Sequence, residues 1–283
     1  MLGDALRAKV CRSTHRSERN VGNIAMIILV TNLPAGLLFA LIVVLPVCTS
    51  YVGISYMRRS TRRPQRSESH NNVAGFIFAT VSAIYAVLLG FLIVDVWNQY
   101  YNADQAVIQE SSAIIGAART AMALPEPARG KILDRLRSYA EIVINEEWRS
   151  DVGLEGSPRA LTTINEIWAI YYSVPLDKVD TNMTASLDAL SAGREVRLLT
   201  NETSMPVIFW VVLVTGGVIT ISFCFILQME DTRVHAGLTA LLTAIITICL
   251  WLILLINHPF SGDFRVTTNA FKHAIYVINS LPR

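Results

Sequence analysis

Val73–Ala123 reads VAGFIFATVSAIYAVLLGFLIVDVWNQYYNADQAVIQESSAIIGAARTAMA. Its first 22 residues, Val73–Val94, carry no charge, and such a run is long enough to cross the hydrocarbon core of a bilayer, about 30 Å, as a helix. Asp95 follows, and polar residues then mix in with no proline before Pro125. We therefore predict one long helix that starts in the membrane and leaves it without a break.

The composition also indicates a membrane protein. The chain has 283 residues, of which 52% are hydrophobic and 16% are charged, and its mean hydropathy is +0.43. Soluble domains usually carry about 25% charged residues. The net charge of +2 is too small to indicate a nucleic-acid partner. It is unevenly distributed, because Asp95–Met205 holds 16 acidic and 10 basic residues and the rest holds 6 and 14.

Uncharged runs of spanning length occur at four places: Leu33–Tyr56, Val73–Val94, Pro206–Leu227 and Gly237–Ile256. In lipid a helix satisfies its own backbone groups, so each run should be helical. We predict an all-α polytopic membrane protein with four transmembrane helices and a helical extramembrane domain inserted between spans two and three. The first run contains Pro46, where we expect a kink.

These runs divide the chain into five parts: a polar N-terminal extension (1–32), spans one and two (33–94), the extramembrane domain (95–205), spans three and four (206–256) and a C-terminal tail (257–283). A signal peptide is an alternative interpretation, because the basic N-terminal residues precede the apolar run Leu33–Tyr56. That run, however, lacks a convincing cleavage site and is long enough to span the membrane. LPVC at Leu45–Cys48 resembles a lipoprotein signal, although Val47 is too large for the position before the cysteine.

The loop over residues 58–72 carries five arginines, and by the positive-inside rule it is cytoplasmic. Residues 95–205 then lie in the periplasm or outside the cell, and we expect a multi-pass protein of the cell inner membrane in contact with membrane lipid. Five basic residues before Val21 oppose this orientation. Translation from Met26 would remove them.

The extramembrane domain shows helical periodicity throughout. One apolar stripe contains Ile132, Leu133, Leu136, Tyr139, Ala140, Val143, Ile144 and Trp148. Ser157-Pro158 can cap the next helix, and a last helix should start near Pro175 and run towards Pro206. The tail ends in a short amphipathic helix that either lies at the membrane interface or packs on the helical domain.

Enzyme motifs are missing: we find no P-loop, dinucleotide glycine pattern, nucleophile elbow or HExxH. The five histidines do not pair at ligand spacing, and the four cysteines show neither zinc spacing nor a disulfide framework. We therefore predict no catalytic, cofactor or metal site, and no enzyme.

Small and hydroxyl residues share faces of two spans. Gly75, Ala79 and Ala83, with Tyr85 nearby, mark the second span, and Thr239, Thr243 and Thr247 mark the fourth. Small residues let helices approach closely, and hydroxyls can hydrogen-bond between helices. Close packing is one interpretation. The other is that these faces line a polar path between subunits.

Charged residues near the spans form a second candidate set. Asp95 lies where the second span ends, next to an aromatic belt, and either is merely solvated or contacts an ion. Arg194 and Arg197 share a helical face. They either pair with a carboxylate (Glu110, Glu146 or Glu147) or present positive charge at a pore mouth. Pairing is favoured because an unpaired charge among helices is costly.

These residues also form an ordered set: YAVLLGF (Tyr85–Phe91), VW (Val96-Trp97), Glu110, EW (Glu147-Trp148), RxxRL (Arg194–Leu198), PxxxW (Pro206–Trp210) and PFSG (Pro259–Gly262). In order and spacing the set resembles the bestrophin-like family of bacterial membrane proteins, from about Leu33 to Phe271. The resemblance implies two spans, a helical domain and two more spans.

The family is compared with bestrophins, which are pentameric anion channels. The resemblance thus implies a homo-oligomeric channel or pore for small inorganic ions. The charge distribution leaves the ion open, because the acidic central domain favours cations and its arginines favour anions. The alternative function is a membrane-anchored sensor or scaffold whose helical domain binds an envelope partner.

Overall fold

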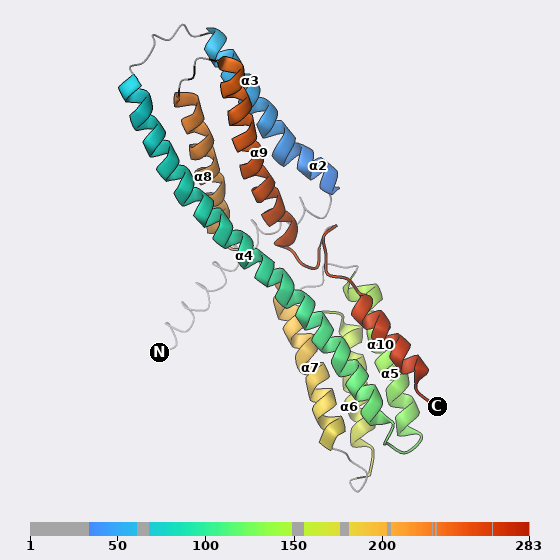
Figure 1. Ribbon diagram of the computed structural model, residues 1–283. Coiled ribbons are helices and arrows are strands. Elements are labelled where there is room, and N and C mark those ends of the chain that lie inside the picture. Colours follow the sequence, from blue (N-terminus) through green and yellow to red (C-terminus); the bar gives the residue numbers. More distant parts are fainter. Residues whose placement is uncertain are drawn as a thin grey trace, which may run out of the picture. The chain divides into compact units, whose positions relative to one another are not determined.

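The computed structural model describes residues 34–60, 68–148, 156–175, 181–202, 205–227, 229, 231–261 and 263–282. Within these ranges every regular element is a helix (Figure 1). Four stretches are long and apolar enough to cross a membrane: Ala35–Met57, Asn71–Ala121, Val207–Ile226 and Thr232–Ile256. The predicted all-α fold, with four spans and a helical region between the second and the third, is confirmed.

The second span begins the longest element. Helix α4 runs from Glu68 to Ala121, 54 residues, and appears in Figure 1 as one unbroken helix from teal to green. The predicted continuation past Asp95 is therefore present. No proline interrupts these residues, so each backbone N–H can bond four residues back along the whole length.

The described chain folds into two compact units, which we treat separately. The membrane unit contains the described residues up to Trp97 and those from 205 to Phe264. The helical unit contains Asn98 to 202 and the residues from Arg265 on. Helix α4 contributes to both units, since its first part lies in one and its second part in the other.

The first span is not a plain α-helix. It consists of α2 (Ala35–Phe39), a π-helical turn η1 (Ala40–Val44) and α3 (Leu45–Ser60). The N–H of Leu45 donates to the carbonyl of Ala40, five residues back. Pro46 follows directly and would clash with the carbonyl four residues before it. We expected a kink at Pro46, and the structure shows this distortion as the π-helical turn η1.

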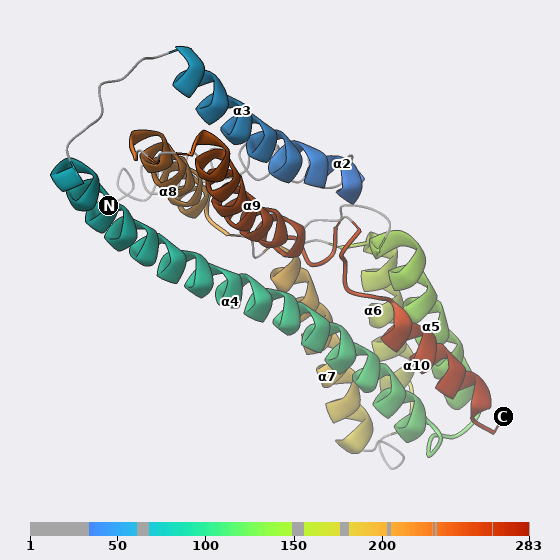
Figure 2. The same ribbon diagram turned by 45° about the horizontal axis from the view of Figure 1, so that its top comes forward.

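The third and fourth spans are α8 (Val207–Ile226) and α9 (Thr232–Ile256), and α9 packs against α3, η1 and α8 (Figure 2). The fourth span starts at Thr232, earlier than the predicted Gly237. The carboxylate of Asp231 caps this helix by accepting the N–H groups of Arg233 and Val234, at 2.8 and 3.4 Å. The cap lets the helix begin before the uncharged run that the sequence shows.

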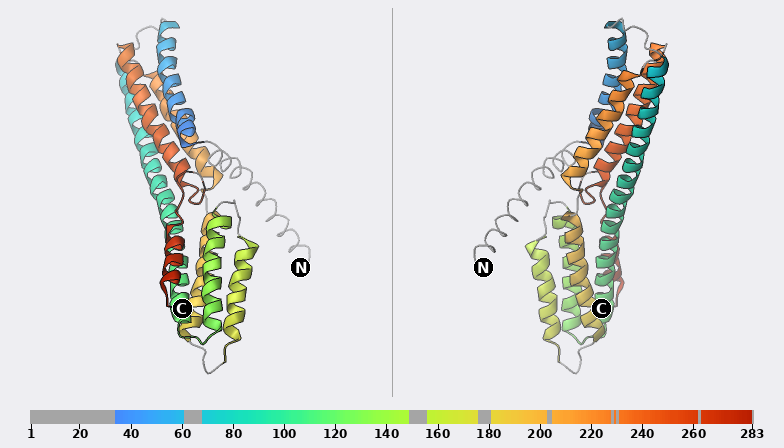
Figure 3. Two further views of the ribbon diagram at one scale, coloured as in Figure 1. Left: turned by 90° about the vertical axis from the view of Figure 1, so that its right-hand side faces the viewer. Right: turned by 90° about the vertical axis from the view of Figure 1, so that its left-hand side faces the viewer.

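The helical unit is a small bundle. Besides the second part of α4 it contains α5 (Ala128–Ile142), a π-helical turn η2 (Val143–Glu147), α6 (Pro158–Tyr172), α7 (Thr181–Glu202) and α10 (Asn269–Ser280). Figure 3 shows α5, α6 and α7 side by side. The bundle core is formed by buried apolar side chains of α5, α6 and α7: Ile132, Leu136, Ile167, Tyr171, Met183, Leu187 and Leu190.

Two local predictions about this unit need correction or qualification. Ser157 occupies the N-cap position of α6, with Pro158 at the first helical position, but its side chain caps nothing. Its hydroxyl donates instead to Glu146. The predicted start of the last helix near Pro175 falls next to residues 176–180, which lie outside the described ranges, and α7 is described from Thr181.

The C-terminal helix α10 packs on α5, so of the two placements considered for it the contact with the helical unit is the one observed. Its buried face contains Phe271, Ala274 and Ile278. The turn between α9 and α10 is held to the membrane unit by Asp263, whose carboxylate accepts the N–H of Ala35 at 3.1 Å.

Candidate functional site

The helical unit contains a cluster of buried charges. Glu110, Glu147, Arg194 and Arg197 are each at most 9% exposed. They come from three elements: Glu110 from α4, Glu147 from the turn η2, and both arginines from α7. We call these four residues, together with Tyr139, the ion network. The sequence prediction named all four charged members but had no means of showing that they share one site.

Arg197 is the centre of the ion network. Its Nε donates to Glu110 Oε2 at 2.5 Å, and its second terminal nitrogen donates to Glu110 Oε1 at 3.2 Å and Glu147 Oε2 at 2.6 Å. Arg194 donates to Glu147 Oε1 at 2.7 Å. Charge-assisted bonds of this kind are about twice as strong as neutral ones. Both guanidinium groups are thus engaged with carboxylates inside the bundle.

Tyr139 completes the ion network. Its hydroxyl donates to Glu110 Oε1 at 2.5 Å, and the side chain is fully buried. Burial raises the pKa of Tyr139 well above its ordinary value, and the nearby charge of Glu110 raises it further. The phenol therefore stays protonated and acts as a donor. The sequence placed Tyr139 in the apolar stripe, where a lone hydroxyl among aliphatic residues was the available signal that it needs a partner.

The electrostatics of the ion network favour the charged forms. Burial alone would raise the pKa of Glu147, but the positive charges of Arg197 and Arg194 outweigh it, and the pKa is lowered. Burial alone would lower the pKa of Arg197, yet the charge of Glu110 and the hydrogen bonds to it raise that pKa. Two positive and two negative charges cancel, so the ion network has no formal net charge.

The π-helical turn η2 presents two consecutive residues to this site. Trp148 donates its backbone N–H to Val143, five residues back, at 3.1 Å. In this wide turn Trp148 lies one turn above Val143, and both Glu147 and Trp148 are buried. Turns of this kind are frequent at functional sites.

Glycines permit two close approaches at the ion network. A Cβ on Gly193 would lie 3.0 Å from the Cα of Glu110, so this glycine lets α7 come close to α4. Gly156 has φ +59°, and a Cβ there would lie 2.4 Å from an Arg194 nitrogen and 2.8 Å from Glu147 Oε1. A side chain at Gly193 would press on the backbone of α4, and one at Gly156 would displace the charged groups of Arg194 and Glu147.

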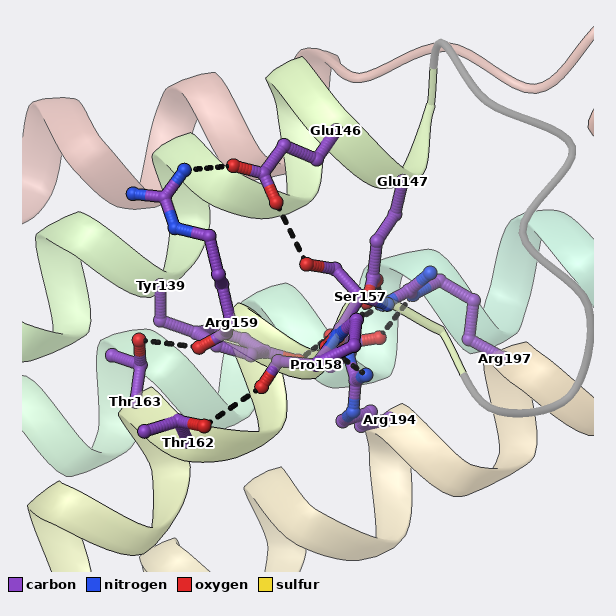
Figure 4. A network of polar contacts seen from close by, with 11 residues as sticks. Tyr139, Glu146, Glu147, Ser157, Pro158, Arg159, Thr162, Thr163, Arg194 and Arg197 are labelled. Carbon is purple, nitrogen blue, oxygen red and sulfur yellow. Dashed lines mark hydrogen bonds and ion pairs between the residues drawn. The ribbon is translucent and has the colours of Figure 1, made fainter.

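The start of α6 is fastened to η2 by Glu146 and Glu147 (Figure 4). The N–H of Ser157 donates to Glu147 Oε1 and its hydroxyl to Glu146 Oε2, both at 2.7 Å. Glu146 also pairs with Arg159. Of the carboxylates considered as partners for Arg194 and Arg197, Glu146 is thus the one that pairs with a different arginine.

Some of the candidate residues in the spans are buried within the chain, and others are exposed. Tyr85 is buried in the membrane unit, and its hydroxyl donates to the carbonyl of Leu213 at 2.8 Å. The threonines of α9, Thr239, Thr243 and Thr247, are also buried, and each hydroxyl donates to the carbonyl four residues before it. These positions fit the close-packing interpretation.

The other candidate residues of the second span are not covered by other parts of the same chain. Ala79 and Ala83 are exposed, and a Cβ on Gly75 would meet nothing within 4 Å. Asp95 is also exposed. In the part of the chain that the structure describes, no group of three or more His, Cys, Asp or Glu side chains is placed to hold a metal ion.

Comparisons with known proteins agree with this architecture. The family description "Bestrophin-like domain" matches residues 31–271. A search of the curated proteins finds no match. Among solved structures, a bacterial bestrophin homologue from Klebsiella pneumoniae with a point mutation is 12% identical, with a TM-score of 0.63 over 86% of this chain and 99% of that chain.

Another structure of a bacterial bestrophin homologue from Klebsiella pneumoniae is 15% identical, with a TM-score of 0.61 over 86% of this chain and 100% of that one. At these identities the likeness concerns the fold. The family match covers most of the residues, including every member of the ion network and all four spans. The chain belongs to the bestrophin-like family.

Proposed function

We propose that this membrane protein is an ion channel or pore assembled from several copies of the chain. The observation that carries the proposal is the surface of α4 within the membrane unit. In the most apolar stretch of α4, only 11% is buried inside the chain, compared with 44% in the corresponding stretch of α9. The span with the most open surface is also the one that bears the small-residue face.

The membrane part of α4 has three distinct sides. Tyr85, Leu89 and Val96 recur at intervals of four and seven and are buried against the chain. Large exposed side chains recur on a second side: Phe76, Ile84, Val87 and Phe91. On a third side small residues recur every three or four positions and are exposed or partly exposed: Gly75, Ala79, Ala83, Ala86 and Gly90. We call this third side the small-residue side.

Lipid tails are the natural neighbours of the second side, where bulky apolar groups project. The small-residue side has a different character, because small residues in a span allow the backbone of another helix to approach closely. A Cβ on Gly75 or Gly90 would meet nothing within 4 Å in this chain. A second copy of the chain supplies such a helix, and a closed ring of copies places one helix face on a central axis.

The family supports the same proposal. The fold is shared with bacterial bestrophin homologues over 86% of the chain, and the resemblance to bestrophins implies ion passage through an oligomer. The permeating species are small inorganic ions. The arginines do not favour anions over cations, since Arg194 and Arg197 are neutralised inside the bundle.

The test is ion flux through purified protein in liposomes. We expect flux above that of empty vesicles for at least one ion in a panel of anions and cations, and a homo-oligomer by mass photometry in detergent. A monomer without flux for any ion would contradict the proposal. Recovery of a specific envelope protein by crosslinking through the helical unit would then favour the sensor or scaffold function.

Substitutions on α4 connect the flux to the small-residue side. Ala79→Leu and Ala83→Leu add bulk where we place a neighbouring copy, and we expect each to reduce flux or the oligomer fraction at least fivefold. Thr80→Leu is the matched control, because Thr80 is exposed on the side that bears Ile84 and Phe91. Equal effects of all three substitutions would show that the small-residue side has no special role.

The location follows from the charge pattern. We propose that the protein lies in the cell inner membrane, with residues 58–72 in the cytoplasm and residues 95–205 in the periplasm or outside the cell. The support is the five arginines of that loop. Residues 34 and 282 would lie on the same side as the extramembrane domain, since the described residues between them contain four spans.

A further inference from the structure

The chain passes between the membrane unit and the helical unit three times. It does so inside α4 between Trp97 and Asn98, again between α7 and α8, and a third time between Phe264 and Arg265. Each of the three segments that enter or leave the helical unit carries a residue of the ion network or a residue that covers it. Glu110 lies in α4, Arg197 in α7, and Val266 and Phe271 lie after the third passage.

The third passage contributes through aromatic contacts. The ring centroids of Trp148 and Phe271 lie 5.7 and 5.8 Å from the guanidinium carbon of Arg197. The two rings meet edge to face at 5.6 Å, and the indole N–H of Trp148 donates to the carbonyl of Val266 at 3.0 Å. Phe271 is fully buried. The segment after the last span therefore closes the site around Arg197.

The three segments depend on one another through Arg197. Its guanidinium bonds Glu110 of the first segment and lies near the Phe271 ring of the third, while its own backbone belongs to the second. Removing one partner of a buried ion pair is strongly destabilising, because the remaining charge is left without a counter-charge and without water to solvate it. Loss of Glu110 would leave the Arg197 guanidinium short of a counter-charge, and loss of the Phe271 ring would remove an aromatic contact from the same guanidinium.

We propose that the ion network and its aromatic cover form a clamp within the helical unit, which makes the three segments that carry Glu110, Arg197 and Phe271 loosen or hold together as one element. The clamp would transmit a disturbance at the C-terminal segment to α4 and α7, and in the reverse direction with equal strength, since coupling between sites is reciprocal. This role goes beyond ion passage and does not require it.

Hydrogen exchange on the full chain in detergent or nanodiscs tests the clamp. Phe271→Ala removes the aromatic cover from α10, and we expect exchange to rise at least tenfold at three places: α10, α4 around Glu110, and α7 from Arg194 to Leu198. Glu110→Gln breaks the network from the other end, and we expect faster exchange in α10.

Ile278→Ala is the matched control. Ile278 is also buried on the same face of α10, but it lies seven residues, about two helical turns, further along than Phe271. The clamp predicts that this change speeds exchange in α10 alone. Indistinguishable exchange profiles for the two alanine variants would overturn the proposal, because α10 would then be ordinary core. If Phe271→Ala fails to fold, Phe271→Leu removes the ring while keeping most of the volume, and the same comparison decides.

The readout separates this proposal from the channel. Exchange is measured without an ion gradient, so a protein that passes no ions can still show the reciprocal pattern. A protein that passes ions can equally show only local effects. The first result would leave the clamp standing and refute the channel, and the second would refute the clamp.

Discussion

Two adjacent residues at the ion network have different partners and different burial, although the sequence gives them the same chemistry. Glu146 and Glu147 are adjacent and chemically identical, yet Glu146 pairs with Arg159 near the surface and Glu147 holds two buried arginines. The two side chains leave the turn η2 in different directions, and that of Glu147 enters the bundle. The sequence offered both as partners, because it does not show which of two adjacent carboxylates is buried.

Glu147 should make stability depend on pH. Its pKa is lowered in the folded state by Arg197 and Arg194, although burial opposes this. A lowered pKa contributes stability that is present above the unfolded-state pKa, about 4.3, and is lost as pH falls through the folded-state value. We expect the thermal unfolding midpoint of the full chain in detergent to fall as pH decreases below about 5.

Glu147→Gln tests this dependence. At pH 7 it leaves two buried arginines short of a counter-charge, a change that typically costs about 3 to 5 kcal/mol, and the remaining acid dependence should be shallower. Glu166→Gln is the control, since Glu166 pairs with Arg135 at 3.2 Å on the surface, where pairs contribute about 0 to 1 kcal/mol. An unchanged acid dependence in Glu147→Gln would refute the assignment.

At the scale of elements, the sequence predicted most of what repeats regularly. The four spans, the unbroken α4 and the apolar stripe of α5 follow from charge-free length and helical spacing. Irregular features were harder to predict. A distortion was expected at Pro46, although not its form as the π-helical turn η1, whereas the turn η2 and the early start of α9 were not predicted. Such features change bonding at one or two residues and leave the hydrophobic pattern nearly intact.

The contact between α4 and α8 is a second element-scale feature. Gly216 and Gly217 of α8 lie against the ring of Tyr85. A Cβ on Gly216 would lie 2.6 Å from Tyr85 Cε2, and the ring cannot swing away freely because its hydroxyl is bonded to Leu213. This pair of glycines therefore permits close packing of α8 against Tyr85 of α4.

Gly216→Ala should therefore destabilise the membrane unit, with a cost of about 1 to 3 kcal/mol for overpacking, visible as a lower thermal midpoint in detergent. Gly237→Ala serves as the comparison, because a Cβ there would meet nothing within 4 Å. In a helix, alanine in place of glycine is favourable by about 1 kcal/mol. If both variants unfold at the wild-type temperature or above, the contact is looser than the distances indicate.

At the scale of the whole molecule, the sequence predicted the class of protein and the family, since both rest on features spread over most of the chain. It could not predict that Glu110, Glu147, Arg194 and Arg197 form one site. They are separated by up to 87 positions, and only the folded bundle brings α4, η2 and α7 together. Phe271 lies in the predicted amphipathic helix of the tail, and nothing local relates it to an arginine in α7.

The orientation is the prediction that belongs to this scale. A reporter that is active only in the cytoplasm, fused after residue 283, should be inactive, whereas the same reporter inserted in the loop over residues 58–72 should be active. A second reporter, active only outside the cytoplasm, should give the opposite pattern. Activity of the first reporter at the C-terminus would reverse the proposed orientation.

The neutral ion network has a consequence for the ionic atmosphere of the protein. Two arginines and two glutamates cancel in the interior, so the acidic excess of residues 95–205, 16 acidic against 10 basic, rests on the remaining side chains. Such an excess gathers counterions, and mobile cations should be concentrated around this part of the chain and chloride depleted. The enrichment fades as ionic strength rises, because at about 0.15 M the Debye length is only about 8 Å.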